Sequence, residues 1–389
     1  MAEKAKKPTL VQKAETVLKK VKPKYYAAAG GIVLGGALIA ACVLGPSYIA
    51  DKHLWQWRGE MDTVQTYTYA ADIAVEGFGE KDTAIHADGA FDRETSSGSI
   101  NLSVTKAGEE KTISASIADA VAYTDSLSFY ELFGEPIMDY IGVEYPDGYW
   151  TQALEDGLIR DTIKVDLRQM KLMDGQVLGR GIEAAVEYWK MVYGEPYYYL
   201  QTLKAPRGIG SELSASWKTE DLLSTMDYYK EYLDINRESV YDAYYHIFKL
   251  LSVSCKGQVN ELLAATWNKS EQTMKDLESG MEAPADGLIE DAESFRAWVE
   301  ENEAEADFSF RREKDSWTIQ MTVSGKDGQR LHASYTRTVA ESVVAEALEG
   351  AENFNLQLGE LISNLSAQAP EDIITTKGGE QPSGAKPQM

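Results

Sequence analysis

The sequence predicts an α+β domain held outside a membrane by one N-terminal helix. Three observations predict this: an uncharged stretch at residues 25–50, alternating strand patterns at about 66–125 and 305–340, and helical spacing at about 127–300. Strand runs that flank a helical section are typical of antiparallel sheets with helices packed on one face. We therefore expect a split antiparallel sheet and a long helical middle section within one external domain.

Residues 25–50 predict a transmembrane helix. At about 1.5 Å per residue, these 26 residues can cross the roughly 30 Å hydrocarbon layer of a bilayer. The preceding basic tail, residues 1–24, holds eight lysines and two glutamates, a net charge of +6. Positive flanks stay in the cytoplasm, so residues 51–366 are expected to form an extracytoplasmic domain.

Two other interpretations of this segment put the domain on the same side of the membrane. A cleaved signal peptide needs a small residue at the first site of its A-x-A pattern, and residues 48–50 read Tyr-Ile-Ala. The four residues that end at Cys42 read Ile-Ala-Ala-Cys, which resembles the lipobox of bacterial lipoproteins. The apolar run continues past Cys42, where lipoproteins usually begin a polar tether. We therefore favour a retained anchor and keep a lipoprotein acylated at Cys42 as the alternative.

The anchor also offers a surface for helix association. Gly31 and Gly35 form a GxxxG spacing, which lets a second helix approach closely in a bilayer. Self-association, or a protein partner bound through this helix, is a hypothesis that these two glycines support.

Composition excludes several kinds of partner and scaffold. The chain carries a formal charge of −24, and phosphate backbones repel such a body, so we expect no nucleic-acid partner. The two cysteines are Cys42, inside the anchor, and Cys255, so the external domain has no internal disulfide framework. Cys255 is read as a buried small apolar residue rather than a catalytic thiol.

The external domain begins with alternating residues. Tyr67, Tyr69, Ala71, Ile73 and Val75 alternate with smaller or polar residues and predict a strand with one dry face. Polar breaks separate three further runs, at residues 83–93, 99–106 and 111–123. These spacings predict an antiparallel meander.

Helical spacing follows from about residue 127. Apolar residues recur every three or four positions at residues 182–193, 219–233 and 240–251. A Phe/Tyr-Gly-Glu-Pro phrase occurs twice, at residues 133–136 and 193–196. We expect each phrase to end a helix, because glycine and proline are typical of helix termini.

Strands then return. Residues 317–323 and 331–335 alternate, and Gly325-Lys326-Asp327-Gly328 predicts the turn of a hairpin between them. Residues 339–365 mix spacings and predict a short helix. Residues 367–389 are rich in glycine and proline and predict a disordered C-terminal tail.

The order of these elements is similar to that of bacterial lipoprotein carriers, in which helices cover a curved sheet that holds a lipid. The similarity is one of element order only and implies a sheet–helix cavity by analogy.

Motifs for catalysis, cofactors and metals are absent from the sequence. It contains no G-x-S-x-G, no P-loop, no H-E-x-x-H and no C-x-x-C. Of its scattered histidines, His246 is expected to be half-buried in a helix and His332 to face solvent. We therefore assign no catalytic, cofactor-binding or metal-binding residue, and the protein is more readily explained as a non-enzyme.

Tyrosine is the one residue type in excess. Tyrosine combines an apolar ring with a polar hydroxyl and so serves both cores and binding surfaces. The candidate binding surface contains Tyr197, Tyr198, Tyr199, Tyr228, Tyr232, Tyr241 and Tyr245.

We expect a non-catalytic protein of the cell envelope whose external domain binds a ligand or a protein partner. One alternative is a carrier or sensor of an apolar molecule held between sheet and helices. Another is a hydrolase of envelope glycans, which needs two carboxylates about 5 to 10 Å apart.

Overall fold

The fold is taken from a computed structural model. It describes residues 52–77, 82–106, 108–119, 121–146, 148–166, 178–208, 210–256, 261–280, 283–343, 345 and 347–368. The predicted anchor, with Gly31, Gly35 and Cys42, lies outside these residues, and so do residues 369–389 of the predicted tail. Among the helices that are described, none is long and apolar enough to cross a bilayer.

The domain is α+β, as predicted, and all its described strands form one eleven-stranded sheet. The strands are β1 (Thr66–Glu76), β2 (Thr83–Asp92), β3 (Ser97–Lys106), β4 (Glu109–Ala118), β5 (Val121–Asp125), β6 (Thr162–Asp166), β7 (Glu212–Trp217), β8 (Glu305–Arg312), β9 (Ser316–Ser324), β10 (Arg330–Val339) and β11 (Glu352–Asn353). Their order across the sheet is β11-β6-β5-β4-β3-β2-β1-β10-β9-β8-β7.

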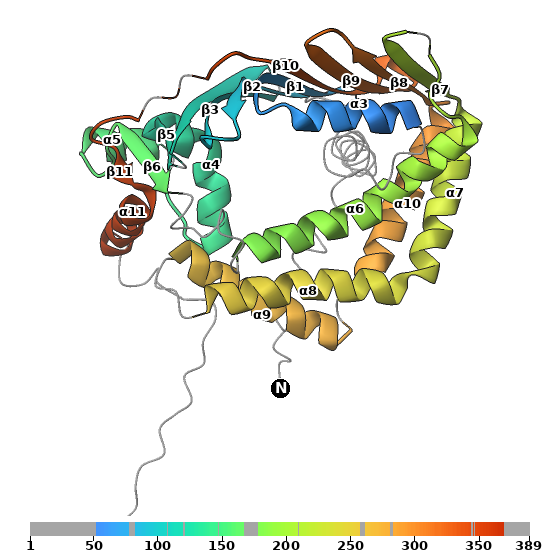
Figure 1. Cartoon of the computed structure of the whole chain (residues 1–389). Helices are drawn as coiled ribbons and strands as arrows, with labels where there is room; N and C mark the ends of the chain where they lie inside the picture. The colour runs from blue at the N-terminus through green and yellow to red at the C-terminus, as the bar shows by residue number, and fades with distance from the viewer. Residues whose placement is uncertain are drawn as a thin grey trace, which may run out of the picture.

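Helices lie against one face of this sheet and at its ends. They are α3 (Lys52–Thr63), α4 (Ser126–Ile141), α5 (Tyr149–Glu155), α6 (Leu178–Leu203), α7 (Thr219–Ile235), α8 (Arg237–Cys255), α9 (Glu261–Glu278), α10 (Pro284–Glu301) and α11 (Phe354–Gln368). Figure 1 shows the sheet arching over an opening, with α6, α8 and α9 on the far side and α7 and α10 closing the β7 end. Helix α3 lies along the inner face of the sheet (Figure 1).

The prediction of a split antiparallel sheet was wrong in two respects. The two meanders join, because β1 pairs with β10 over ten residue pairs, from Tyr67 with Val339 to Glu76 with Arg330. The sheet is mixed, because β11 pairs with β6 in parallel. No local pattern shows a pairing between segments more than 250 residues apart.

The predicted helical section at about residues 127–300 contains helices α4 to α10, but it also contains two strands that were not predicted. Strands β6 and β7 interrupt this section and extend the two ends of the sheet. Both strands are short, at five and six residues. An alternation of apolar and polar residues over so few positions does not distinguish a strand from a loop next to a helix. The predicted strand at 111–123 is divided into β4 and β5 by a turn at Asp119, whose φ of 46° is left-handed.

The predicted hairpin at residues 325–328 is confirmed. Strands β9 and β10 pair from Ser316–Thr338 to Ser324–Arg330, and the turn between them uses left-handed φ angles of 59° at Asp327 and 78° at Gly328. Asp and Gly tolerate this conformation, so the turn was readable from a few adjacent residues.

The two Gly-Glu-Pro phrases do not end helices. Pro136 lies inside α4 and Pro196 inside α6. An internal proline removes a helical hydrogen bond, and packing of these helices against the rest of the domain offsets that loss. The glycine before each proline is buried. At Gly134 an added Cβ would lie 2.5 Å from Cζ2 of Trp150, so the glycine serves the contact between α4 and α5.

Replacing Gly134 with alanine should therefore destabilise the domain by about 1 to 3 kcal/mol, because Trp150 is held in a stack with Tyr130, with ring centroids 4.8 Å apart. The matched control is Gly287, a glycine of α10 with nothing within 4 Å of its added Cβ. Alanine there should stabilise the helix by about 1 kcal/mol. Urea unfolding measures both; equal effects at the two sites would contradict the packing role of Gly134.

Two hydrophobic cores lie on the helical side of the sheet, at opposite ends. The first joins strands β7–β10 to α3, α6, α7 and α10 and includes Trp217, Trp298 and Phe310. The second joins β6 to α4, α5 and α11 and includes Tyr130 and Trp150. A third cluster joins α6, α7, α8 and α10 to one another. The middle of the sheet lies between the first two cores.

Candidate functional site

Between the two cores, the inner face of the sheet is apolar but only partly buried. We call this surface the apolar strip; the register of β1–β4 gives its two rows as Ile73, Ile85 and Val104, and Ala71, Ala87, Leu102 and Ile113. Of the seven side chains only that of Ile113 is buried. None belongs to any of the three hydrophobic clusters. The strip is therefore an apolar surface that the described helices leave open.

Tyr69 and Gly89 border the strip. The Tyr69 side chain packs against Gly89, because a Cβ added to this glycine would lie 2.9 Å from the Tyr69 hydroxyl oxygen. The same hydroxyl donates to the carbonyl oxygen of Ser99 at 3.2 Å. Burial, chiefly, raises the pKa of Tyr69 to about 12, so the hydroxyl stays neutral and acts as a donor at ordinary pH. The ring thus extends the apolar face toward β3 with its one polar atom satisfied.

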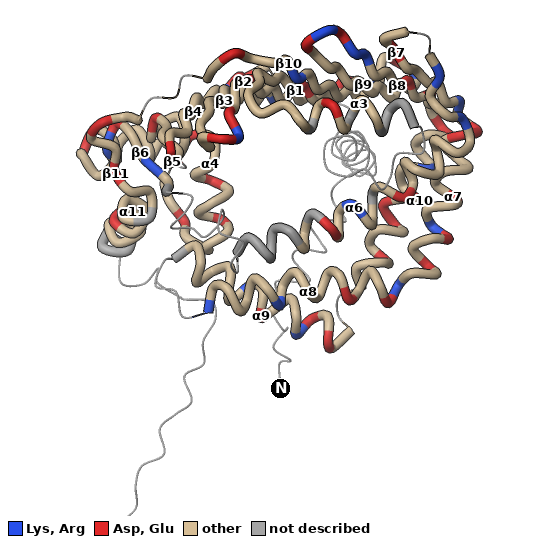
Figure 2. The backbone as a smooth tube through the Cα atoms, viewed as in Figure 1, with Lys and Arg blue, Asp and Glu red and all other residues tan. Residues whose placement is uncertain are grey.

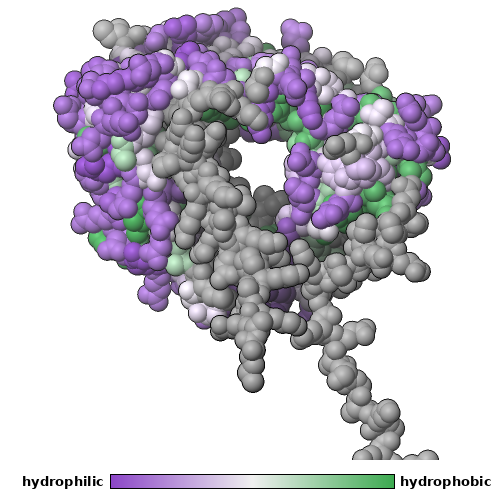
Figure 3. Space-filling view, turned by 180° about the vertical axis from the view of Figure 1, so that it is seen from behind, coloured by the Kyte–Doolittle hydropathy of each residue, from purple (hydrophilic) through white to green (hydrophobic). Residues whose placement is uncertain are grey.

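The strip faces an opening in the molecule. Figure 1 draws α4 below β3 on one side of the opening and α3 below β1 and β10 on the other, with the opening between these two helices. The space-filling view looks through the opening and shows apolar residues on part of its rim (Figure 3). Acidic residues occur on the sheet and on the helices around it (Figure 2). A ligand in this space would meet an apolar wall within a negatively charged body.

Helix α3 is held on the inner face by a buried arginine. Arg337, 4% exposed, donates from Nη1 to the Met61 carbonyl oxygen and from Nε to the Tyr335 hydroxyl, both at 3.0 Å. Its Cζ atom lies 4.2 Å from the centre of the Tyr67 ring. The Met61 carbonyl belongs to the last turn of α3, where carbonyls need partners from outside the helix. Arg337 therefore links the end of α3 to the centre of the sheet.

The outer face of the same strands is polar and is tied by a chain of hydrogen bonds. Asp72 on β1 accepts from Ser334 on β10 at 3.1 Å and contacts His86 Nδ1 on β2 at 2.6 Å. His86 Nε2 lies 3.3 Å from Asp88, which accepts from Asn101 on β3 at 3.0 Å. The pKa of His86 is raised, chiefly by its hydrogen bond to Asp72. Ser334 is buried, whereas the side chains of Asp72, His86 and Asp88 are exposed, and together they tie neighbouring strands on a polar face.

The predicted tyrosine surface is divided between the core and two separate helix contacts. Tyr197 is 3% exposed in the first core, whereas the neighbouring Tyr198 is 39% exposed. Tyr199 and Tyr228 stack at 4.0 Å between α6 and α7, and Tyr232 follows at 6.4 Å.

Two of the tyrosine hydroxyls donate to glutamates of neighbouring helices. The Tyr228 hydroxyl donates to Glu195 at 2.7 Å, and burial, followed by this hydrogen bond, raises its pKa. Tyr241 stacks on Tyr245 at 6.1 Å, and the Tyr245 hydroxyl donates to Glu278 at 2.8 Å, which joins α8 to α9. Five of the seven residues thus belong to two separate groups of contacts, one between α6 and α7 and one on α8 that reaches α9 through Tyr245. A binding role for the exposed edges stays a prediction.

Two predictions about histidines were wrong. His246 is exposed rather than half-buried, because it lies on the outer side of α8. His332 is partly buried rather than solvated, and its Nδ1 lies 2.9 Å from the Thr322 hydroxyl. Burial, chiefly, lowers the pKa of His332. Cys255 is buried and free, as predicted.

No group of three or more His, Cys, Asp or Glu side chains that could hold a metal ion occurs in the described part of the chain.

Scans against protein-family models, curated proteins and solved structures found no match to this chain. The candidate site therefore rests on geometry alone.

Sequence reasoning missed the apolar strip as a site. The alternation at Ile73, Ile85 and Leu102 was visible, but alternation predicts a dry face without saying what covers it. Coverage depends on where the helices pack, and that is set by contacts between distant segments.

Proposed function

We propose that this protein is a non-catalytic, membrane-anchored binding protein whose external domain holds an acyl chain of a lipid against the apolar strip. The observation that carries the proposal is the strip itself: seven apolar side chains in two rows between two packed cores, six of them only partly buried. Of the expected functions, the carrier or sensor of an apolar molecule accounts best for this surface.

An apolar ligand that covers the strip would be stabilised by the burial of the strip's side chains. Fully burying one aliphatic side chain of this size stabilises by about 1.5 to 3 kcal/mol. Side chains such as Ile73, Ile85, Leu102 and Val104 are only partly buried. A ligand that buries them further would gain part of this free energy on binding. A linear chain fits two parallel rows that cross strands β1–β4 better than a compact ligand does.

The predicted anchor supports a lipid as the source of that chain. One residue would separate the end of the anchor, at residue 50, from the start of α3 at Lys52. Arg337 holds the other end of α3 on the inner face of the sheet. An anchor so close to α3 would keep the opening within a helix length of the bilayer surface, where acyl chains are the most abundant apolar ligands.

Photocrosslinking tests this proposal. Full-length protein is reconstituted in vesicles that contain a phospholipid with a diazirine in its acyl chain, and labelled peptides are identified after illumination. We expect label within residues 25–50, from the anchor, and also within residues 82–106, from the strip. Leu102→Glu places a charge on the strip and should remove only the second label.

The matched control is Ser103→Glu, because successive residues of β3 point to opposite faces of the sheet. This variant should keep both labels. Label confined to residues 25–50 in the wild type would contradict the acyl-binding proposal while leaving the anchor in place. Absence of label at residues 25–50 would contradict the anchor instead.

A further inference from the structure

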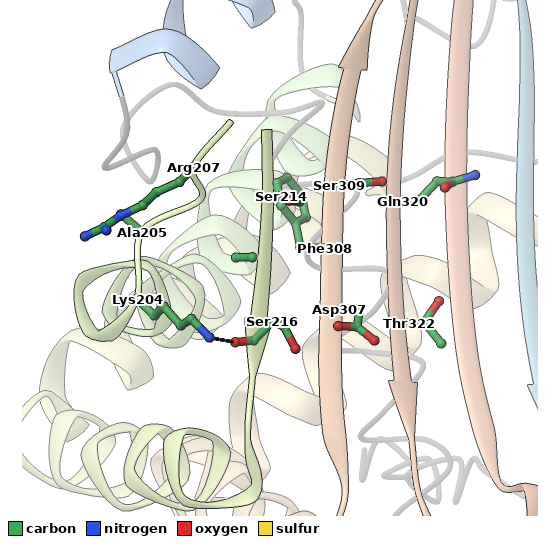
Figure 4. A pocket seen from close by; sticks show the side chains of 11 residues that line it. Lys204, Ala205, Arg207, Ser214, Ser216, Asp307, Phe308, Ser309, Gln320 and Thr322 are labelled. Atoms are coloured by element: carbon green, nitrogen blue, oxygen red, sulfur yellow. Dashed lines mark hydrogen bonds between the residues drawn. The ribbon is translucent and has the colours of Figure 1, made fainter. Parts of the chain in front are cut away.

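A cavity lies on the face of the sheet opposite to the apolar strip, against strands β7, β8 and β9. Its volume is 620 Å³, within the range of small-ligand sites. Figure 4 shows the three strands as its floor and residues 204–207, which we call the strap, as its wall beyond β7. The residues that line it are Lys204, Ala205, Arg207, Ser214, Ala215, Ser216, Asp307, Phe308, Ser309, Gln320 and Thr322.

The floor of this cavity is a grid of small polar side chains. The register places Ser214, Ser309 and Gln320 in one row across the three strands. The neighbouring row contains Ser216, Asp307 and Thr322. Directly opposed side chains in a sheet lie about 5 Å apart, so hydroxyl, amide and carboxylate groups repeat in two directions.

Two cationic residues stand on the strap. Lys204 Nζ donates to the Ser216 carbonyl oxygen at 2.5 Å, at the margin of the floor. Arg207 exchanges backbone hydrogen bonds with Ser214, at 2.8 and 2.9 Å, and within the described chain no carboxylate pairs with its guanidinium. Figure 4 shows the Lys204 side chain directed toward β7 and the Arg207 side chain directed away from the three strands. In a protein of charge −24, these residues put positive charge along the strap, at the margin of the floor.

We propose that this cavity binds an acidic oligosaccharide, with its hydroxyls on the polar grid and its acidic group at the strap. Sugar hydroxyls both donate and accept, which suits a floor of serine, threonine, glutamine and aspartate side chains. An anionic group gains charge-assisted hydrogen bonds from lysine and arginine. This inference is independent of the acyl-chain proposal, because the two sites lie on opposite faces of the sheet.

A peptide fits the cavity less well. Extended peptides bind by pairing with a free sheet edge and by placing side chains in apolar pockets. The strap already occupies the β7 edge through Arg207 and Lys204. Phe308 is 2% exposed and packs in the first core, so it gives the cavity no open apolar pocket. The cavity also contains one carboxylate, Asp307, and not the pair that glycoside hydrolysis requires.

The test is an NMR titration of the full-length protein in nanodiscs with two tetrasaccharides of equal size, one containing glucuronate and one neutral. We expect saturable shifts with the acidic sugar and at least ten-fold weaker binding of the neutral one. Ser309→Tyr should fill the cavity and weaken binding of the acidic sugar at least ten-fold. Lys204→Gln combined with Arg207→Gln should reduce its affinity to that of the neutral sugar.

Arg311→Tyr is the control for the bulky variant, because Arg311 lies two residues from Ser309 on the same face of β8 but outside the lining. It should change the affinity by less than two-fold. Equal binding of the two sugars, no saturation at 10 mM, or unchanged binding in Ser309→Tyr would each overturn the proposal.

Discussion

Replacing Arg337 with alanine should lower the free energy of unfolding of the α+β domain by about 3 to 5 kcal/mol, because several interactions of one buried guanidinium are lost together. The change removes two hydrogen bonds of 3.0 Å, to the Met61 carbonyl and the Tyr335 hydroxyl. It also removes the cation–π contact with Tyr67 and leaves a cavity at the centre of the inner face.

The same variant should release α3 before the rest of the domain unfolds. Hydrogen exchange of residues 56–63 should rise well before exchange in β9 and β10, because Arg337 joins the last turn of α3 to the sheet. Denaturant unfolding and exchange measured by mass spectrometry give the two quantities.

Arg311→Ala is the matched control for this prediction. Arg311 is an exposed arginine on β8 that pairs with Glu212 at 3.2 Å, and such surface pairs contribute about 0 to 1 kcal/mol. Equal destabilisation by the two variants, or unchanged exchange of residues 56–63 in Arg337→Ala, would show that Arg337 does not hold α3.

The second large effect concerns the anchor. Replacing both Gly36 and Leu38 with arginine should abolish stable membrane insertion, because each charge at the centre of a spanning helix costs roughly 2.5 to 3.5 kcal/mol on the insertion scale. Wild-type protein should resist extraction by alkali, and added protease should digest the external domain while residues 1–24 stay protected.

The substitution Cys42→Ser distinguishes a retained anchor helix from a lipoprotein acylated at Cys42. A retained helix should tolerate this change, whereas a lipoprotein would lose its acyl chains and its processing. A mature N-terminus at an acylated Cys42 would contradict the retained helix and leave the predicted external location unchanged.

The parts of the fold that the sequence predicts are those set by neighbouring residues. The hairpin at Asp327-Gly328 was readable because turn chemistry and alternation lie within about twenty residues. Helices α7 and α8 were readable because their spacing persists for 17 and 19 residues. The α+β class followed from the same local patterns.

What the sequence did not predict depends on contacts between distant segments. The pairing of β1 with β10 turns two meanders into one sheet, and the pairing of β7 with β8 joins strands about ninety residues apart. The helix breaks expected at Pro136 and Pro196 fail for the same reason, since packing outweighs local preference.

The two candidate sites also depend on contacts between distant segments. An aliphatic row such as Ile73, Ile85 and Val104 can be read as a dry face, but its exposure depends on where the two cores form. The outer cavity requires the strap to pair with the edge of β7, which the sequence does not indicate. Both sites are therefore properties of the assembled sheet.

The central claim is that the apolar strip holds an acyl chain. Native mass spectrometry of residues 51–368, secreted behind a cleavable signal peptide and purified without detergent, tests it most directly. The account predicts a species heavier than the polypeptide by one acyl-chain molecule in the wild type, and its loss in Leu102→Glu but not in Ser103→Glu. A wild-type domain found only at its polypeptide mass, and still at that mass after incubation with a long-chain fatty acid, would contradict the claim.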